Sequence, residues 1–411
     1  MVRLRIRSML VLLVLYGGIA FTAASAADHG LIVQQTRAQE EAEPRGIEEE
    51  IRFQSGNATI HGTLFWPATA AGDFPAVVIL AGSDRSQRGP LRIRLARYLA
   101  ANQVAALVYD SPGTGTSTGS ALLQTRDERV TEALHAVGFL RNKPGIRADA
   151  VGLLGGSEGA DIAIMAAARE PLVSFVIAVS GAMGVSVLDR LRYSAEKKGY
   201  DEGLDAEEIL KAMTFKEVAF VLLSGVDIVE WPLIESRSRE WNDDSWTTLV
   251  ELAKLRVQGA LTNPQKESLL VSLRQVVQHF SGERWFATVD PDGALQRAVN
   301  MDADMFFRLL ESGRYSRDWD TNLRRDAADI QCPILAVWGE QDSFLPPHQS
   351  ATRLTKFLAD SGHADHQIRI FPNASHFLTT AGPDTDFIPG YLELMTEWLN
   401  TRFPATRQSG R

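Results

Sequence analysis

The chain has 411 residues, a formal net charge of −9, and apolar and charged fractions that are ordinary for a soluble globular protein. This acidic balance, with no basic stripe or arginine-rich tract, argues against nucleic acid as a partner. The only cysteine, Cys332, excludes an intrachain disulfide, and its place before an apolar run predicts a small buried thiol. No Cys/His cluster has metal-ligand spacing and no glycine-rich loop has that of a P-loop, so we expect neither a metal nor a cofactor.

Residues 1–26 have the features of a secretory signal peptide. A basic start is followed by an apolar run from Met9 to Ala20 and by a small-residue cleavage site, Ala24-Ser25-Ala26. The apolar run is somewhat short for a membrane span, which favours cleavage over the alternative of an uncleaved N-terminal membrane anchor. We therefore expect a periplasmic or secreted protein without a stable membrane anchor. Residues 27–46 are polar and predict a flexible lead-in.

The next segment, residues 47–183, alternates strands with helices. Two strands, 47–54 and 59–66, are joined by Ser55-Gly56-Asn57, which predicts a hairpin. Later strands are apolar throughout, as in a parallel sheet covered on both faces. We expect further strands at 74–81, 104–109, 150–154 and 174–180, and helices at 90–101, 126–141 and 160–168. The alternation predicts a mostly parallel, doubly wound α/β sheet.

The alternation stops after Gly181, and residues 184–325 have the patterns of helices. Asp205 and Glu208 have the spacing of a capping box, and Asn263-Pro264 starts a run of apolar residues with a period of 3.6. Most of the tryptophans lie in this insert, where such aromatic side chains usually pack against one another. The alternation resumes in residues 326–403, with strands at 333–338 and 366–371 and helices at 347–361 and 388–403. Residues 404–411 form a tail.

The motif that predicts chemistry is Gly155-Gly156-Ser157-Glu158-Gly159, between an apolar strand and a helix-favouring run. Strand, Gly-x-Ser-x-Gly and helix form the arrangement called a nucleophile elbow. The serine sits in a strained turn where the chain passes close to itself, and glycines leave room for that approach. The turn also directs the backbone N–H of Glu158 to where an oxyanion would form. The alternative is a tight turn that merely contains a serine.

Two partners for Ser157 follow strand ends. Asp342 follows the strand at 333–338, and His376 follows the last strand. Because the carboxyl ends of parallel strands meet at one edge of a sheet, these three side chains can converge there. His376 would take the proton of Ser157, and Asp342 would hold the imidazole tautomer. Asp189 is the alternative acid.

Three other histidines are alternatives to His376 as the base. His348, His363 and His366 lie nearby in the sequence, but none of them follows a strand end as His376 does. A loop histidine is usually just solvated, and Asp342 could instead cap the helix near Pro347. The three positions taken together favour a Ser-His-Asp triad.

The chain resembles the α/β-hydrolase superfamily, close to its bacterial esterase and prolyl-oligopeptidase-like, dienelactone-hydrolase-related branch. The resemblance rests on the motif around Ser157, the loop Asp110–Ser117, the acid loop Gly339–Asp342 and the histidine loop Asn373–His376. It covers residues 47–183 and 326–403 and implies an α/β-hydrolase fold. By position, the backbone N–H of Ser83 would be the second oxyanion donor. The chain departs from the branch at Ala81, where its oxyanion loop usually has histidine, and at Pro112 and Gly156.

These residues predict a serine hydrolase that cleaves a carboxylic ester of a small molecule. Alternatives are an amide or peptide bond, as in aminopeptidases or prolyl-oligopeptidase-like enzymes, an acyl thioester, or a catalytically silent binding protein. We expect the insert 184–325 to be a lid, because it enters the chain at the carboxyl edge that carries Ser157. The alternative is an insert that packs sideways and serves oligomerisation; the oligomeric state is not predicted.

Overall fold

The computed structural model describes residues 46–68, 73–84, 86–121, 124–259, 261–291, 293–312, 329–380 and 386–405. The predicted signal peptide, residues 27–45 of the predicted lead-in and residues 406–411 of the predicted tail 404–411 therefore lie outside the described residues. The chain divides into two compact units. Among the described residues, 46–184, 329–342 and 347–405 form an α/β unit, and 185–312 with Ser343–Pro346 form a helical unit.

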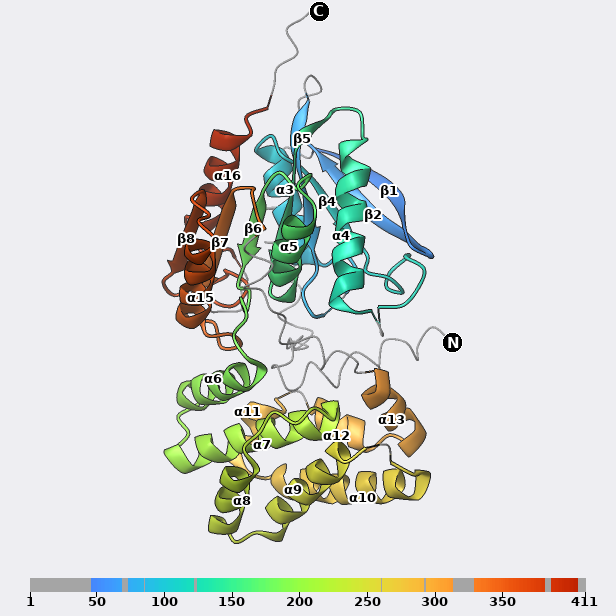
Figure 1. The fold of residues 1–411 in the computed structure, drawn as a ribbon, viewed down its shortest axis with the longest axis vertical. Helices are drawn as coiled ribbons and strands as arrows, with labels where there is room; N and C mark the ends of the chain where they lie inside the picture. Colours follow the sequence, from blue (N-terminus) through green and yellow to red (C-terminus); the bar gives the residue numbers. More distant parts are fainter. Residues whose placement is uncertain are drawn as a thin grey trace, which may run out of the picture. The chain divides into compact units, whose positions relative to one another are not determined.

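The α/β unit is built on an eight-stranded sheet with strand order β1-β2-β4-β3-β5-β6-β7-β8 (Figure 1). Strands β1 and β2 pair antiparallel, β2 pairs antiparallel with β4, and all later pairs are parallel. The strands are β1 (Ile47–Ser55), β2 (Ala58–Trp66), β3 (Phe74–Leu80), β4 (Ala105–Tyr109), β5 (Ile146–Gly156), β6 (Val176–Val179), β7 (Ile334–Gly339) and β8 (His366–Phe371). The predicted hairpin and the mostly parallel doubly wound sheet are confirmed.

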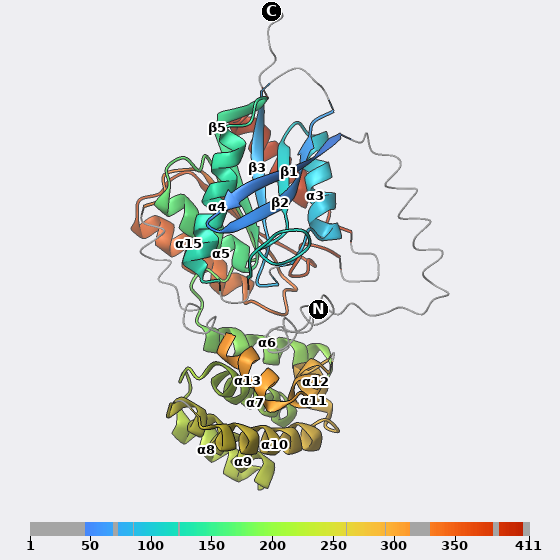
Figure 2. The same cartoon turned by 90° about the vertical axis from the view of Figure 1, so that its right-hand side faces the viewer.

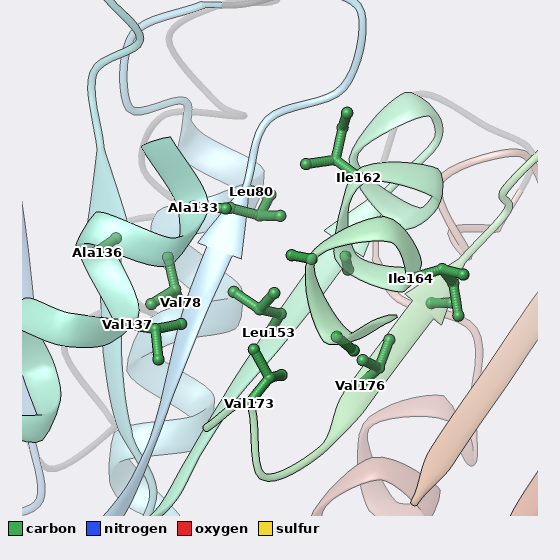
Figure 3. Close-up of a cluster of buried hydrophobic side chains, with 14 of the residues drawn as sticks. Val78, Leu80, Ala133, Ala136, Val137, Leu153, Ile162, Ile164, Val173 and Val176 are labelled. Carbon is green, nitrogen blue, oxygen red and sulfur yellow. The ribbon is translucent and has the colours of Figure 1, made fainter. Parts of the chain in front are cut away.

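Helices cover both faces of the sheet because its central strands are apolar on both sides. Side chains of β3, β5 and β6 pack against α4 and α5 on one face, as Figure 3 shows for Val78, Leu153 and Val137. On the other face, alternate residues of the same strands, such as Val77 and Ile177, pack with α3 and α16. The helices of this unit are α3 (Pro90–Ala101), α4 (Arg126–Arg141), α5 (Glu158–Arg169), α15 (Pro347–Asp360) and α16 (Tyr391–Arg402).

Several predicted boundaries differ from the structure: the strand expected at 150–154 extends over Ile146–Gly156, and the helix expected at 160–168 over Glu158–Arg169. Two further differences coincide with residues of positive φ. The last helix begins at Tyr391 and not at 388, because Gly390 has a φ of 84°, which a right-handed helix cannot accommodate. The strand predicted at 174–180 extends only over Val176–Val179, and Ser180 leaves extended geometry with a φ of 49°. Both turns lie outside the apolar runs on which the predictions were based.

The helical unit contains α6 (Val187–Asp201), α7 (Ala206–Ser224), α8 (Trp231–Glu240), α9 (Asp244–Val257), α10 (Asn263–Phe280), α11 (Arg284–Val289), α12 (Ala294–Val299) and α13 (Ala303–Ser312) (Figure 2). The predicted capping box is present at the start of α7, where Asp205 accepts a hydrogen bond from the backbone N–H of Glu208. The unit has its own apolar core. None of the helices in the described part of the chain is long and apolar enough to cross a lipid bilayer.

The core of the helical unit is centred on an aromatic cluster. The Phe215 ring of α7 lies 5.8 Å from Trp285 and 5.2 Å from Phe286, measured between centroids. Trp246 stacks on Trp285 at 5.6 Å. These tryptophans are buried and pack within the insert, as the sequence indicated for most of its aromatic residues.

Candidate active site

Ser157 occupies a sharp turn between β5 and α5. Its φ of 55° and ψ of −125° are unusual for a residue with a side chain, and its backbone N–H bonds the carbonyl of Val179 at 2.8 Å. The glycines around it are needed for space. A Cβ at position 155 would lie 1.9 Å from the carbonyl oxygen of Gly159. At Gly156, in contrast, a Cβ would meet nothing within 4 Å. The local geometry is that of a nucleophile elbow.

Asp342 and His376 form a buried pair. Nδ1 of His376 lies 2.6 Å from Oδ2 of Asp342, and their side chains are 7% and 0% exposed. An ionised carboxylate only accepts hydrogen bonds, so this contact assigns the ring hydrogen to Nδ1. The lone pair is then on Nε2, the nitrogen that a general base requires.

The strand order brings this pair to the edge of the sheet that carries Ser157. Strands β5, β6, β7 and β8 are parallel neighbours, and Ser157, Asp342 and His376 each follow the carboxyl end of one of them. Several residues with side chains and positive φ lie in the loops of this edge: Ser157, Ser180, Met183, Asn373 and Leu378. Such backbone geometry concentrates at sites where the surrounding structure fixes the position of a side chain.

The competing residues hold other positions. Asp189 lies in the first turn of α6, where its carboxylate accepts a hydrogen bond from Ser186 Oγ at 2.8 Å. His363 bonds the carbonyl of Cys332, just before β7, and His366 is the first residue of β8. These two histidines therefore lie at the amino ends of their strands, away from the elbow.

The loop after β3 lies against the nucleophile. A Cβ at Gly82 would be 3.4 Å from the Cβ of Ser157 and 3.4 Å from the carbonyl oxygen of Gly156. Ser83 comes next and is exposed. Two backbone N–H groups are predicted to donate to the oxyanion, that of Ser83 and that of Glu158 in the first turn of α5. Their role stays a prediction. The position of Glu158 at a helix N-terminus favours negative charge nearby.

Asp110, in the loop that the resemblance singled out, has a structural role. Its carboxylate accepts bonds from the backbone N–H of Arg88 at 2.8 Å and of Thr116 at 3.1 Å. Burial acts to raise the pKa of Asp110, but these bonds and the Arg88 guanidinium outweigh it, so the pKa is lowered. Gly115 is required here, because a Cβ would lie 2.2 Å from Oδ2 of Asp110.

Sequence reasoning missed two buried arginines beside the elbow. Arg126 and Arg129 extend from α4 to the Glu158 carboxylate. Both lie on the stripe that continues with Val130 and Ala133, which pack against the sheet. Their place on this apolar stripe was the sequence feature that could have indicated their burial. Arginines three residues apart more usually mark a solvated helix face.

Within the described residues, no group of His, Cys, Asp and Glu side chains could hold a metal ion.

Comparison with known proteins found two family models that match parts of the chain. Residues 134–222, which include Ser157, match the C-terminal BAAT / acyl-CoA thioester hydrolase family. Residues 320–401, which include Asp342 and His376, match the dienelactone hydrolase family. A search of curated proteins found no match.

Among solved structures, the chain is similar to Est1E from Butyrivibrio proteoclasticus with bound ferulic acid, at 14% identity and a TM-score of 0.44, covering 85% of this chain and 96% of that one. It is also similar to the Pyrococcus furiosus esterase Pf2001, at 14% identity and a TM-score of 0.46, covering 87% and 91%. Such low scores carry no argument about activity.

The strand order and the two family matches define the chain as a hydrolase with the α/β-hydrolase fold. The dienelactone hydrolase match, over residues 320–401, agrees with the resemblance drawn from the sequence.

Proposed function

We propose that the protein hydrolyses a carboxylic ester of a small molecule through an acyl-enzyme on Ser157. The observation that carries this proposal is the buried pair of His376 and Asp342, at 2.6 Å, on the sheet edge that also carries the strained Ser157 turn. A histidine held in this way presents Nε2 as the basic nitrogen, at the edge where a hydroxyl is raised above the sheet.

The steps follow from these roles. Ser157 Oγ attacks the acyl carbon while Nε2 of His376 takes its proton, and the carbonyl oxygen becomes an oxyanion bound by the backbone N–H groups of Ser83 and Glu158. The C–O bond to the leaving alcohol then breaks, and the alcohol takes the proton from His376. Water then attacks the acyl-enzyme and gives a proton to His376. The bond between the acyl carbon and Ser157 Oγ breaks, His376 returns the proton to Oγ, and the acid leaves.

An acyl thioester is the second candidate substrate. The observation that favours it is the match of residues 134–222 to a family of acyl-CoA thioester hydrolases, since this stretch includes the proposed nucleophile. An amide or peptide bond would use the same groups and differ in the leaving amine.

Two measurements test the proposal. A fluorophosphonate probe should label the wild-type chain and not Ser157→Ala. A panel of p-nitrophenyl esters of rising chain length, acyl thioesters, and aminoacyl and peptidyl substrates should show the highest kcat/KM for an oxygen ester. An unlabelled wild-type protein would indicate a silent binding protein, and a preference for thioesters or peptides would replace the ester assignment.

We also propose export, because residues 1–26 have the charge, apolar run and cleavage site of a signal peptide. Expression with the native N-terminus should yield a product in the periplasm or medium that starts at Ala27. N-terminal sequencing decides this, and a membrane-bound product retaining residues 1–26 would contradict it.

A further inference from the structure

A buried ionic cluster lies directly behind the proposed nucleophile. From α4, Arg126 Nε lies 3.2 Å from Oε1 of Glu158 and Arg129 Nη1 lies 2.6 Å from Oε2 of the same carboxylate. Arg126 also approaches Asp161 of α5 at 3.6 Å. All four side chains are at most 6% exposed. Glu158 is the residue after the nucleophile, so this cluster fixes the first turn of α5.

Arg129 makes a second contact that Arg126 does not share. Its Nη2 donates to the backbone carbonyl of Ala81 at 2.6 Å. Ala81 begins the loop after β3, two residues before Ser83. The same carbonyl packs against α5, because a Cβ at Gly159 would lie 2.6 Å from it. One guanidinium thus joins the two chain segments that carry the proposed oxyanion donors.

The two contacts of Arg129 restrict the positions of the proposed oxyanion donors, the backbone N–H groups of Ser83 and Glu158. The bond to Ala81 fixes the plane of the peptide between residues 81 and 82, and the next peptide carries the N–H of Ser83. The bond to Glu158 fixes the residue that carries the other N–H. Oxyanion donors are effective only when they are held in place before charge develops on the substrate. A planar guanidinium with donors in a rigid fork can hold both segments at once.

Charge gives Arg129 a further role. A carboxylate immediately after the nucleophile would disfavour an oxyanion nearby, and desolvation makes this effect larger than in water. The guanidinium groups of Arg126 and Arg129 compensate the negative charge of Glu158 where it is buried.

We propose that Arg129 is a positioning residue for the oxyanion site, setting the distance between the N–H groups of Ser83 and Glu158 by bonding Ala81 and Glu158 together. This inference rests on the proposed function, because it concerns the same acyl-transfer step. Arg129 acts through the backbone that it holds and need not touch the substrate.

The test compares Arg129→Lys with Arg126→Lys. Both keep a buried cation beside Glu158, but lysine lacks the fork and only Arg129→Lys loses the joint contact with Ala81. We expect Arg129→Lys to lower kcat about 10- to 100-fold with little change in KM, since displaced oxyanion donors affect mainly the transition state. Arg126→Lys should lower kcat by less than about threefold, as expected for a change in packing alone.

The affinity of a tetrahedral inhibitor separates a displaced oxyanion site from a general change in packing. A boronic acid bound to Ser157 places an oxygen in the oxyanion site, so its affinity for Arg129→Lys should fall by about the same factor as kcat/KM. If Arg129→Lys melts below the assay temperature, the neutral pair Arg129→Gln/Glu158→Gln replaces it. Glutamine at 129 cannot span both partners, so the same losses are expected.

Three results would overturn the inference: equal effects of the two lysine variants, a rise in KM with unchanged kcat, or unchanged boronic acid affinity. Failure of the proposed function has a different signature. In that case fluorophosphonate would not label Ser157 in the wild type, and Ser157→Ala would keep full turnover. Labelled Ser157 with an unaffected Arg129→Lys variant would overturn the positioning role alone.

Discussion

The indole N–H of Trp338 donates to the backbone carbonyl of Gly181 at 2.9 Å. These residues are far apart in sequence, since Gly181 follows β6 and Trp338 lies near the end of β7, and helices α6 to α13 are inserted between them. Strands β6 and β7 are also paired through four register positions, from Val176 with Ile334 to Val179 with Val337. The α/β unit therefore closes its sheet across the point of insertion with its own contacts.

Replacing residues 184–325 with a short Gly/Ser linker should leave the α/β unit folded, because the β6–β7 pairing does not depend on the insert. If the insert is a lid, as its point of entry predicts, the variant should keep fluorophosphonate labelling of Ser157 and lose chain-length selectivity among p-nitrophenyl esters. Circular dichroism checks folding. Unchanged selectivity with a changed oligomeric state would mean that the insert serves assembly instead.

Removing the proposed nucleophile or base should abolish most of the turnover. We expect Ser157→Ala and His376→Ala each to lower kcat by about 10⁵- to 10⁶-fold, and the double variant to be little worse, because triad members act as a unit. Steady-state assays with a p-nitrophenyl ester measure this. Near-wild-type turnover in either single variant is incompatible with the mechanism.

The acid can be assigned by a matched pair of variants. Asp342→Asn should lower kcat about 10⁴-fold, because the same substitution in a serine protease leaves the imidazole in the wrong tautomer. Asp189→Asn should have little effect on kcat, since that carboxylate bonds Ser186 at the start of α6. The reverse order of effects would transfer the acid role to Asp189.

Much of the site could be predicted because its residues follow strands that are visible as apolar runs. Ser157, Asp342 and His376 each follow such a run, so the positions of the loops follow from the order of the strands. The contacts of Arg129 could not be predicted in this way. Its partners are a backbone carbonyl at position 81 and a carboxylate at position 158, which only the packing of α4 on α5 and β3 brings together.

Lys216 of α7 should make the helical unit less stable at neutral pH. Its side chain is fully buried and donates to Ser194 Oγ at 3.1 Å, and no carboxylate within the described residues forms an ion pair with it. Burial, with a smaller effect of Lys198, lowers its pKa well below the usual lysine value. As the pH falls through the ordinary lysine range, the unfolded chain therefore takes up a proton before the folded chain does, and stability decreases.

Lys216→Met should accordingly raise the free energy of unfolding by about 1–3 kcal/mol at pH 7, with a smaller gain at pH 9.5. Urea denaturation followed by tryptophan fluorescence measures this: the helical unit contributes Trp246 and Trp285 to the signal, and the α/β unit contributes Trp338. Lys211→Met, on the same helix but partly exposed and paired with Glu207, is the control and should change stability little. A destabilised Lys216→Met variant would show that the amine is needed in the fold.

Cys332 should be inert in the folded protein. Burial raises the pKa of its thiol to about 12, so almost no reactive thiolate is present at pH 8. Iodoacetamide at pH 8 should leave the native chain unmodified and its ester hydrolysis unchanged, while the urea-unfolded chain should be alkylated at one site, as intact mass would show. Rapid alkylation of the native chain would contradict the raised pKa of this partly buried thiol.

The glycines of the elbow divide into fixed and replaceable positions. Gly155 and Gly159 exclude any side chain, since a Cβ would collide with backbone atoms, whereas a Cβ at Gly156 would meet no atom within 4 Å. Position 156, next to the nucleophile, can therefore carry a side chain without a change in the conformation of the turn. A library restricted to this codon would explore substrate preference on an otherwise unaltered catalytic framework, and would make position 156 the natural first choice for directed evolution of this hydrolase.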